Sequence, residues 1–273
     1  MREQVHLFGS HTGLVGVVTS PETPRPGAPA LLYANVGLNH RVGPSRGWVE
    51  LARRLADKGF LSLRFDLAGF GDSDQRREAI DDTERAVMDT REAMDFLAER
   101  HGQDRFVIVA NCSGVDSQHV TALRDERVVG MVAIDGYVYR NRGYALHKAL
   151  RPFDADRWRR YVLRRRQARA GGGRRGTGSA NDVWTRDWLT QEQFATVLAT
   201  LTARGTRILF VYTSGVDTHL NYAGQFHDMF GYRDRIEVAF FPRADHLFAE
   251  TSERARMVET VTDWMTGIWS AEE

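Results

Sequence analysis

The sequence contains a single cysteine, Cys112, among its 273 residues. One thiol excludes a disulfide within the chain and leaves no basis for a cysteine-ligated zinc site. Long apolar runs are also missing, since none approaches the roughly 18 residues that span a bilayer. Residues 1–10 lack the basic and then apolar layout of a secretory signal. We therefore expect a cytoplasmic protein that does not bind membranes.

The chain has few prolines, 7 against 25 glycines, and a net charge of only +1. With 42% hydrophobic and 27% charged residues, the composition excludes collagen-like, low-complexity and mostly disordered proteins. The charge is unevenly distributed, because residues 137–178 hold 13 Lys or Arg against two Asp and the remainder is acidic. The basic segment could attract an anionic partner. The alternative interpretation of this segment is a solvated helical face followed by a disordered loop at 171–179.

Apolar runs of strand length recur along the chain. Two short runs, 4–8 and 14–18, flank a turn at 10–13 and predict a hairpin. Six later runs are continuous, which is typical of strands covered on both faces: 30–36, 61–65, 106–110, 128–134, 207–212 and 236–241. Helical patterns lie at 48–55, 86–97 and 257–269. We expect an α/β fold with a mostly parallel sheet, helices on both faces, and a ligand site at the carboxyl ends of the strands.

Cys112 lies at the end of one of these runs, in the order Ala110-Asn-Cys-Ser-Gly114. Small residues two positions either side of a nucleophile are typical of the strand–turn–helix arrangement called a nucleophile elbow. There the start of the helix favours a thiolate, and the backbone N–H of Ser113 faces the developing oxyanion. Ser113 fits less well as the nucleophile, because the β-branched Val115 would then occupy a position that must be small. The alternative for Cys112 is a buried structural thiol.

A nucleophile of this kind needs a base, and the chain order in such folds is nucleophile, acid, histidine. His246 follows the last strand-like run and precedes the last helix, so we expect it to be the base. Asp217 follows the run at 207–212 and is expected to orient the histidine ring. Three other residues are alternatives in these two roles: Asp135, His219 and Asp245.

Two further stretches carry a family resemblance. Residues 66–73, Asp-Leu-Ala-Gly-Phe-Gly-Asp-Ser, resemble the Asp-x-x-Gly-x-Gly-x-Ser loop of the α/β-hydrolase superfamily. Residues 35–46, together with 51–55 and 63–66, resemble the hydrolases associated with exosortase systems and related serine-aminopeptidase-like proteins, which also place cysteine at the elbow. Here Ala110 and Val115 replace the family's usual glycine and alanine, and both departures are small enough to keep an elbow. The resemblance implies an α/β-hydrolase fold over nearly the whole chain.

The resemblance also implies that the loop after the third strand supplies a second oxyanion donor, which maps to the backbone N–H of Leu38. Polar side chains crowd this loop, and we expect them to bind an acyl group or carrier that bears carboxylate, phosphate or hydroxyl groups. The expected substrate-binding residues are Asn39, His40, Arg41, Arg46 and Tyr137. The alternative is that Arg41 and Arg46 form structural ion pairs with Asp66 or Asp72.

Residues 137–203 are expected to form a lid or cap inserted after the sixth strand, between core segments 1–136 and 204–273. Aromatic residues interleave with arginines there, which suits an apolar underside and a basic top. Coenzyme A or an acyl carrier protein would match that charge, whereas no nucleic-acid-binding motif appears and no nucleic-acid partner is expected. We expect no metal or cofactor, and a homodimer is compatible with the sequence.

These features predict an acyl hydrolase, either a thioesterase or an esterase. It would work through a Cys112–His246–Asp217 triad and a covalent acyl-cysteine intermediate. The second hypothesis is an acyltransferase or condensing enzyme, because a thioester intermediate is receptive to amines and thiols as well as to water. A non-catalytic binding protein on the same fold is the third.

Overall fold

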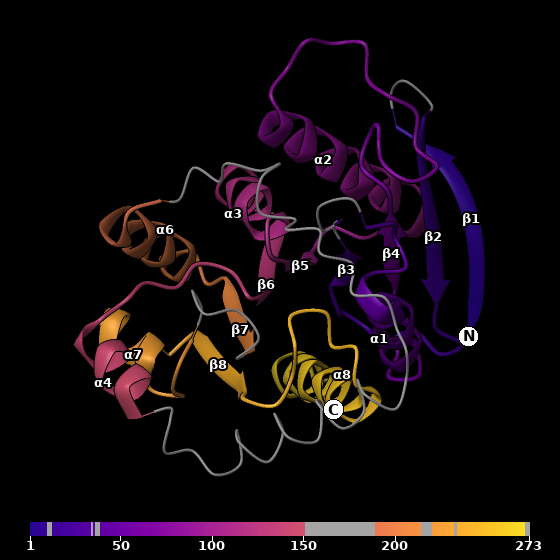
Figure 1. Ribbon diagram of the computed structural model, residues 1–273. Helices are drawn as coiled ribbons and strands as arrows, with labels where there is room; N and C mark the ends of the chain where they lie inside the picture. The colour runs from indigo at the N-terminus through magenta and orange to yellow at the C-terminus, as the bar shows by residue number, and fades with distance from the viewer. Residues whose placement is uncertain are drawn as a thin grey trace, which may run out of the picture.

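A computed structural model describes residues 1–9, 13–33, 35, 39–150, 189–213, 220–231 and 234–270. Its centre is one eight-stranded sheet in the order β1-β2-β4-β3-β5-β6-β7-β8 (Figure 1). The strands are β1 (Arg2–Phe8), β2 (Leu14–Ser20), β3 (Ala30–Tyr33), β4 (Ser62–Phe65), β5 (Phe106–Asn111), β6 (Val128–Ile134), β7 (Arg207–Thr213) and β8 (Ile236–Phe241).

The predicted hairpin is present, since β1 and β2 pair antiparallel and β2 pairs antiparallel with β4. All other neighbouring strands are parallel. The third run was expected to extend to residue 36, but β3 ends at Tyr33. Two residues beyond it, the Asn35 side chain accepts a hydrogen bond from Leu67 N–H and donates one to Asp66. The sheet confirms the predicted α/β class.

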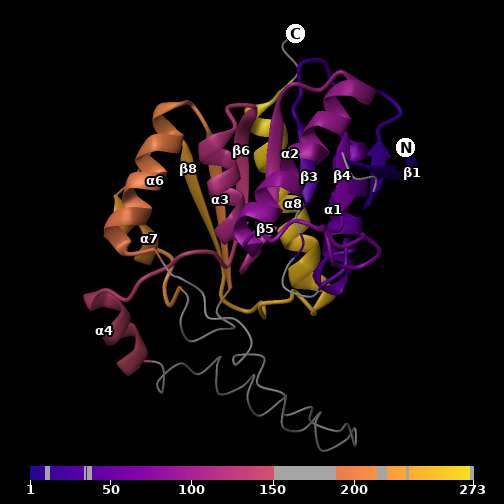
Figure 2. The same cartoon turned by 90° about the horizontal axis from the view of Figure 1, so that it is seen from above.

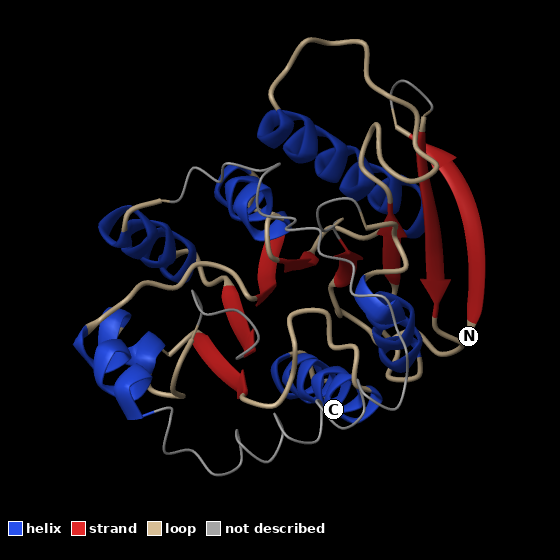
Figure 3. Ribbon diagram, in the orientation of Figure 1, coloured by secondary structure: helices blue, strands red, loops and turns tan. Residues whose placement is uncertain are grey.

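Helices cover both faces of the sheet (Figure 3). In the described residues they are α1 (Gly47–Ala56), α2 (Asp82–His101), α3 (Gly114–Arg124), α4 (Arg142–Leu150), α6 (Gln191–Ala203), α7 (Gln225–Phe230) and α8 (Thr251–Ile268), with a short 3-10 turn, η1, at Pro44–Arg46. α2 is longer than predicted because the Asp81 side chain caps its first turn and Gly102, with a φ of 66°, ends it.

Two apolar clusters fill the spaces between the sheet and its helices. On one face α1 and α8 pack through residues such as Leu51, Val261 and Trp264. On the other face α2, α3 and α6 pack through residues such as Leu97, Ala122 and Leu198. Because the central strands are buried on both faces, the carboxyl ends of the strands are left as the place where polar chemistry can be exposed.

The segment that was expected to form a lid divides into parts with different structural roles. α6 belongs to the core, since Phe194, Leu198 and Leu201 are buried against the sheet and α3. α4 instead projects from the carboxyl-end edge of the sheet (Figure 2). It is tied to the chain before α7, where Tyr222 accepts a hydrogen bond from Asn141. Residues 151–188 lie outside the described part of the chain, and for them the expected lid stays a prediction.

Within the described residues, no helix combines the length and the apolar character that crossing a bilayer requires. This agrees with the absence of long apolar runs in the sequence.

The placement of α6 can be tested through stability. We expect Leu198→Ala to lower the free energy of unfolding by about 2–5 kcal/mol, because it removes a fully buried side chain and leaves a cavity. Thr200→Ala, on the exposed side of the same helix, is the control and should change it by no more than about 0.5 kcal/mol. Equal, small effects in urea unfolding would instead place α6 in a detachable lid.

Candidate active site

Cys112 occupies a tight turn between β5 and α3. Its φ is 52°, in the left-handed region that side-chain-bearing residues rarely adopt. The turn is held from both sides, since Cys112 N–H donates to the Ile134 carbonyl at 2.9 Å and Val115 N–H donates to the Cys112 carbonyl at 3.1 Å. The side chain is partly exposed. This strand–turn–helix geometry is the one that the spacing of small residues predicts.

The small residues around Cys112 have a direct steric reason. A Cβ placed on Gly114 would lie 2.7 Å from the backbone oxygen of Asn35 and 3.7 Å from the Cβ of Ala110. Backbone cannot move aside easily, so position 114 accepts only glycine without a rearrangement. The elbow is therefore pressed against the loop that follows β3.

His246 lies in the loop between β8 and α8, and its imidazole contacts two side chains. Nδ1 donates to Asp135 Oδ2 at 2.8 Å, and the ring also hydrogen-bonds the Cys112 side chain. The histidine side chain is 24% exposed, whereas that of Asp135 is fully buried. The structure thus joins Cys112, His246 and Asp135 in one hydrogen-bonded line.

Asp135 is held in place by the neighbouring strand. It follows β6 with a φ of 47°, and its backbone N–H donates to Val211. Thr213, at the end of β7, donates to the carboxylate twice, from its backbone N–H to Oδ1 and from its hydroxyl to Oδ2, both at 2.7 Å. These bonds leave the carboxylate oriented to accept the proton of His246 Nδ1, which fixes the tautomer of the ring.

The environment of His246 favours its charged form. Burial would lower the pKa of the imidazole, but hydrogen bonds to Asp135 and Cys112 and the negative charges of both groups raise that pKa to about 10. An imidazole with such a pKa carries a proton at neutral pH. A protonated histidine beside a cysteine is the setting that stabilises a thiolate.

Among the described residues, the carboxylate that contacts His246 belongs to Asp135, while the expected acid, Asp217, stays a prediction. Asp217 lies outside the described residues, and so does His219. Asp245 is directed at its own turn, where it accepts from the N–H groups of Leu247 and Ala249. Asp135, one of the alternatives, is the carboxylate that bonds His246 Nδ1.

Of the two expected oxyanion donors, the structure describes Ser113. Ser113 directly precedes α3. Its backbone N–H has no backbone acceptor in the described part of the chain, whereas those of Cys112 and Val115 are both bonded. A free N–H at a helix N-terminus beside the thiol is suited to a developing negative charge. Leu38 lies outside the described residues.

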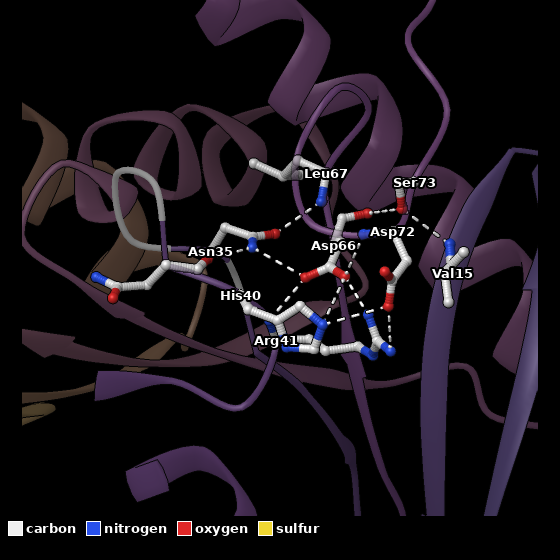
Figure 4. A network of polar contacts seen from close by, with 9 residues as sticks. Val15, Asn35, His40, Arg41, Asp66, Leu67, Asp72 and Ser73 are labelled. Carbon is white, nitrogen blue, oxygen red and sulfur yellow. Dashed lines mark hydrogen bonds and ion pairs between the residues drawn. The ribbon is translucent and has the colours of Figure 1, made fainter. Parts of the chain in front are cut away.

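Two of the residues expected to bind substrate, His40 and Arg41, contact acidic side chains near the carboxyl ends of β3 and β4 (Figure 4). Arg41 forms ion pairs with both Asp66 and Asp72. The buried Asp66 carboxylate also accepts from Arg41 N–H at 2.6 Å and from Asn35 Nδ2 at 3.2 Å. His40 Nε2 lies 3.4 Å from Asp72. For Arg41 the structural ion pair is therefore the correct interpretation.

The other three residues that were expected to bind substrate are Asn39, Tyr137 and Arg46. Asn39 contributes its backbone carbonyl, which accepts from Asn35 Nδ2 at 2.7 Å. Tyr137 is buried, with its ring against His119 and Phe194 in the core. Arg46 is exposed, and no carboxylate of the described residues lies within ion-pair distance of it.

His40, Asp66 and Asp72 place three ligand-type atoms within 4.8 Å of one another. The guanidinium of Arg41 pairs with both carboxylates. The described contacts of this cluster are therefore those of an ion-pair network around Arg41.

Comparison with known families now decides the classification. The family model described as Hydrolase_4, serine aminopeptidase S33, matches residues 33–200, which is more than half of the chain. The chain belongs to this family. It is an α/β-hydrolase by fold.

Solved structures agree on the fold. An α/β serine hydrolase homologue from Coxiella burnetii has 14% identity and a TM-score of 0.60, with 96% of this chain and 97% of that chain covered. The esterase domain of a Rhodothermus marinus protein has 15% identity and a TM-score of 0.57, with 96% and 97% covered. The α/β hydrolase GrgF from Penicillium sp. sh18 has 13% identity and a TM-score of 0.61, with 97% and 98% covered. Comparison with curated proteins gives no match.

The charge state of His246 can be measured by NMR of its imidazole nitrogens. We expect the ring to remain protonated at pH 8, because its pKa is raised to about 10. Cys112→Ala should lower that pKa, since it removes a hydrogen bond and a negative charge. A folded-state pKa above the unfolded value of about 6.5 contributes stability below pH 6.5, which is lost as the pH rises toward 10. A wild-type midpoint near 6.5, unchanged in Cys112→Ala, would contradict the coupling.

Proposed function

We propose that this hydrolase cleaves ester or thioester bonds through a Cys112–His246–Asp135 triad and a covalent acyl-cysteine intermediate. The observation that carries the proposal is the imidazole of His246, which bonds the Cys112 side chain and, through Nδ1, the buried Asp135. The resemblance to exosortase-system hydrolases, which also carry cysteine at the elbow, supports it.

In the first half-reaction the Cys112 thiolate attacks the carbonyl carbon of the substrate and forms a carbon–sulfur bond. The negative charge that develops on the carbonyl oxygen faces the backbone N–H of Ser113. The tetrahedral intermediate then collapses, the bond to the leaving alcohol or thiol breaks, and His246 gives that group its proton. The products are an acyl-cysteine thioester and a neutral imidazole.

The second half-reaction restores the enzyme. Neutral His246 takes a proton from a water molecule, whose oxygen attacks the thioester carbon. The carbon–sulfur bond breaks, the carboxylic acid leaves, and Cys112 returns as a thiolate beside an imidazolium. Asp135 keeps its charge throughout and stabilises the imidazolium through Nδ1, which is the role of the third member of such triads.

The cysteine also supports acyl transfer as a second candidate reaction. A thioester intermediate reacts readily with amines and thiols, so an acceptor that reaches the site before water would carry the acyl group away. The basic residues of 137–178 favour an acyl group delivered on coenzyme A or an acyl carrier protein in the cytoplasm. Arg41 is not available to such a carrier, because Asp66 and Asp72 already hold its guanidinium.

Intact-protein mass spectrometry after exposure to an activated acyl thioester tests the covalent step. We expect wild-type protein to gain the mass of one acyl group, and hydroxylamine, which cleaves thioesters, to remove it. Cys112→Ala should gain nothing, since Cys112 is the sole thiol of the chain. Equal labelling of both proteins, or none of wild type while product still forms, would overturn the mechanism. The released product, acid or amide, separates hydrolysis from transfer when an amine is added.

A further inference from the structure

A large cavity lies at the end of the sheet opposite the candidate active site. Its volume is about 1020 Å³, and its lining comes from the amino ends of β5, β6 and β7, the chain before β3, and the last residues of α8. The size is at the upper limit of the range of small-molecule sites.

The cavity is lined by arginines from three separate parts of the sequence. Within the part of the chain that the structure describes, four arginines line it against one carboxylate, Glu126: they are Arg105, Arg204, Arg207 and Arg235. These residues lie within the part of the chain that is acidic overall, so the positive charge here arises from folding and not from a basic run. Like charges gathered on one concave surface attract a multiply charged anion.

The arginines of the cavity bond backbone carbonyls and not carboxylates. Arg105, Arg207 and Arg235 each donate at 3.3 Å, to the carbonyls of residues 27, 234 and 205 respectively. Arg204 donates to the carbonyls of residues 122 and 123 at the end of α3. Among the described residues, no carboxylate oxygen lies within 4.0 Å of any of these four guanidiniums, in contrast to Arg127, which pairs with Asp95 and Asp125.

A guanidinium offers five N–H donors, and these arginines use only one or two each in the bonds above. The remaining donors are arranged around the cavity without a counter-charge in the described structure. Phosphate oxygens match the planar fork of arginine and can bridge several such forks at once. We propose that this arginine cavity binds a polyphosphate group, either a free polyphosphate or the phosphate chain of a nucleotide.

The arginine cavity is distinct from the acyl-binding site. Arg105 directly precedes β5 and Cys112 directly follows it, while β6 lies between the cavity residue Glu126 and Asp135. Seven residues of strand span roughly 20 Å at about 3.3 Å per residue. A ligand here therefore does not contact the triad, and the proposal does not depend on the proposed acyl chemistry.

Binding can be measured by isothermal titration calorimetry of the full chain with tripolyphosphate and, separately, with ATP. The test variant is R105Q/R235Q, because both side chains are exposed and make one long hydrogen bond each. The control is R77Q/R85Q, which removes the same charge from the loop before α2 and its first turn, at the other end of the sheet. Circular dichroism and Tm verify that each variant is folded.

We expect wild type and control to bind tripolyphosphate alike, and R105Q/R235Q to bind about tenfold or more weakly. Affinity should fall as ionic strength rises. ATP binding as tightly as tripolyphosphate would assign recognition to the phosphates alone, and tighter ATP binding would identify a nucleotide as the ligand. No binding of either probe at about 1 mM, or an equal loss in test and control variants, would overturn the proposal.

Discussion

The hydrogen bond between the buried Asp135 carboxylate and His246 Nδ1 organises the rest of the active site. It fixes the ring that contacts Cys112 and raises the pKa of the imidazole. The backbone is adjusted to make this contact. Among the described residues, five other than glycine have a positive φ, and three of them are Cys112, Asp135 and Phe248, two positions after His246. Strain of this kind costs about 1–3 kcal/mol per residue, and here it is concentrated around the proposed reacting groups.

Much of this arrangement could be predicted from sequence because it depends on local rules. Continuous apolar runs identify strands that are covered on both faces. The nucleophile position follows from the space that Gly114 must leave for the Asn35 carbonyl, which sequence shows as small residues around Cys112. His246 could be found from its place between the last strand and the last helix.

What sequence could not determine depends on contacts between distant segments. Asp135 and Asp217 both follow strands, and only the packing of β6 between β5 and β7 shows that Asp135 faces His246. The sequence signal for Asp135 was its position at the end of a fully apolar strand, because burying a carboxylate there costs free energy unless a partner is present. The ion pair between Arg41 and Asp66 also joins two separate loops, so sequence alone did not decide between it and the alternative. The arginine cavity was hidden because its residues are dispersed over 105–235.

The pH dependence of Cys112 alkylation by iodoacetamide tests the central claim most directly, because the chain has no other thiol to react. We expect rapid alkylation at pH 6, where an ordinary thiol with a pKa of about 8.5 is almost wholly protonated. Asp135→Asn should slow that reaction about tenfold or more, and more than Asp217→Asn does. A wild-type rate that rises with the pH dependence of a free thiol, or a larger loss in Asp217→Asn, would contradict the proposed triad.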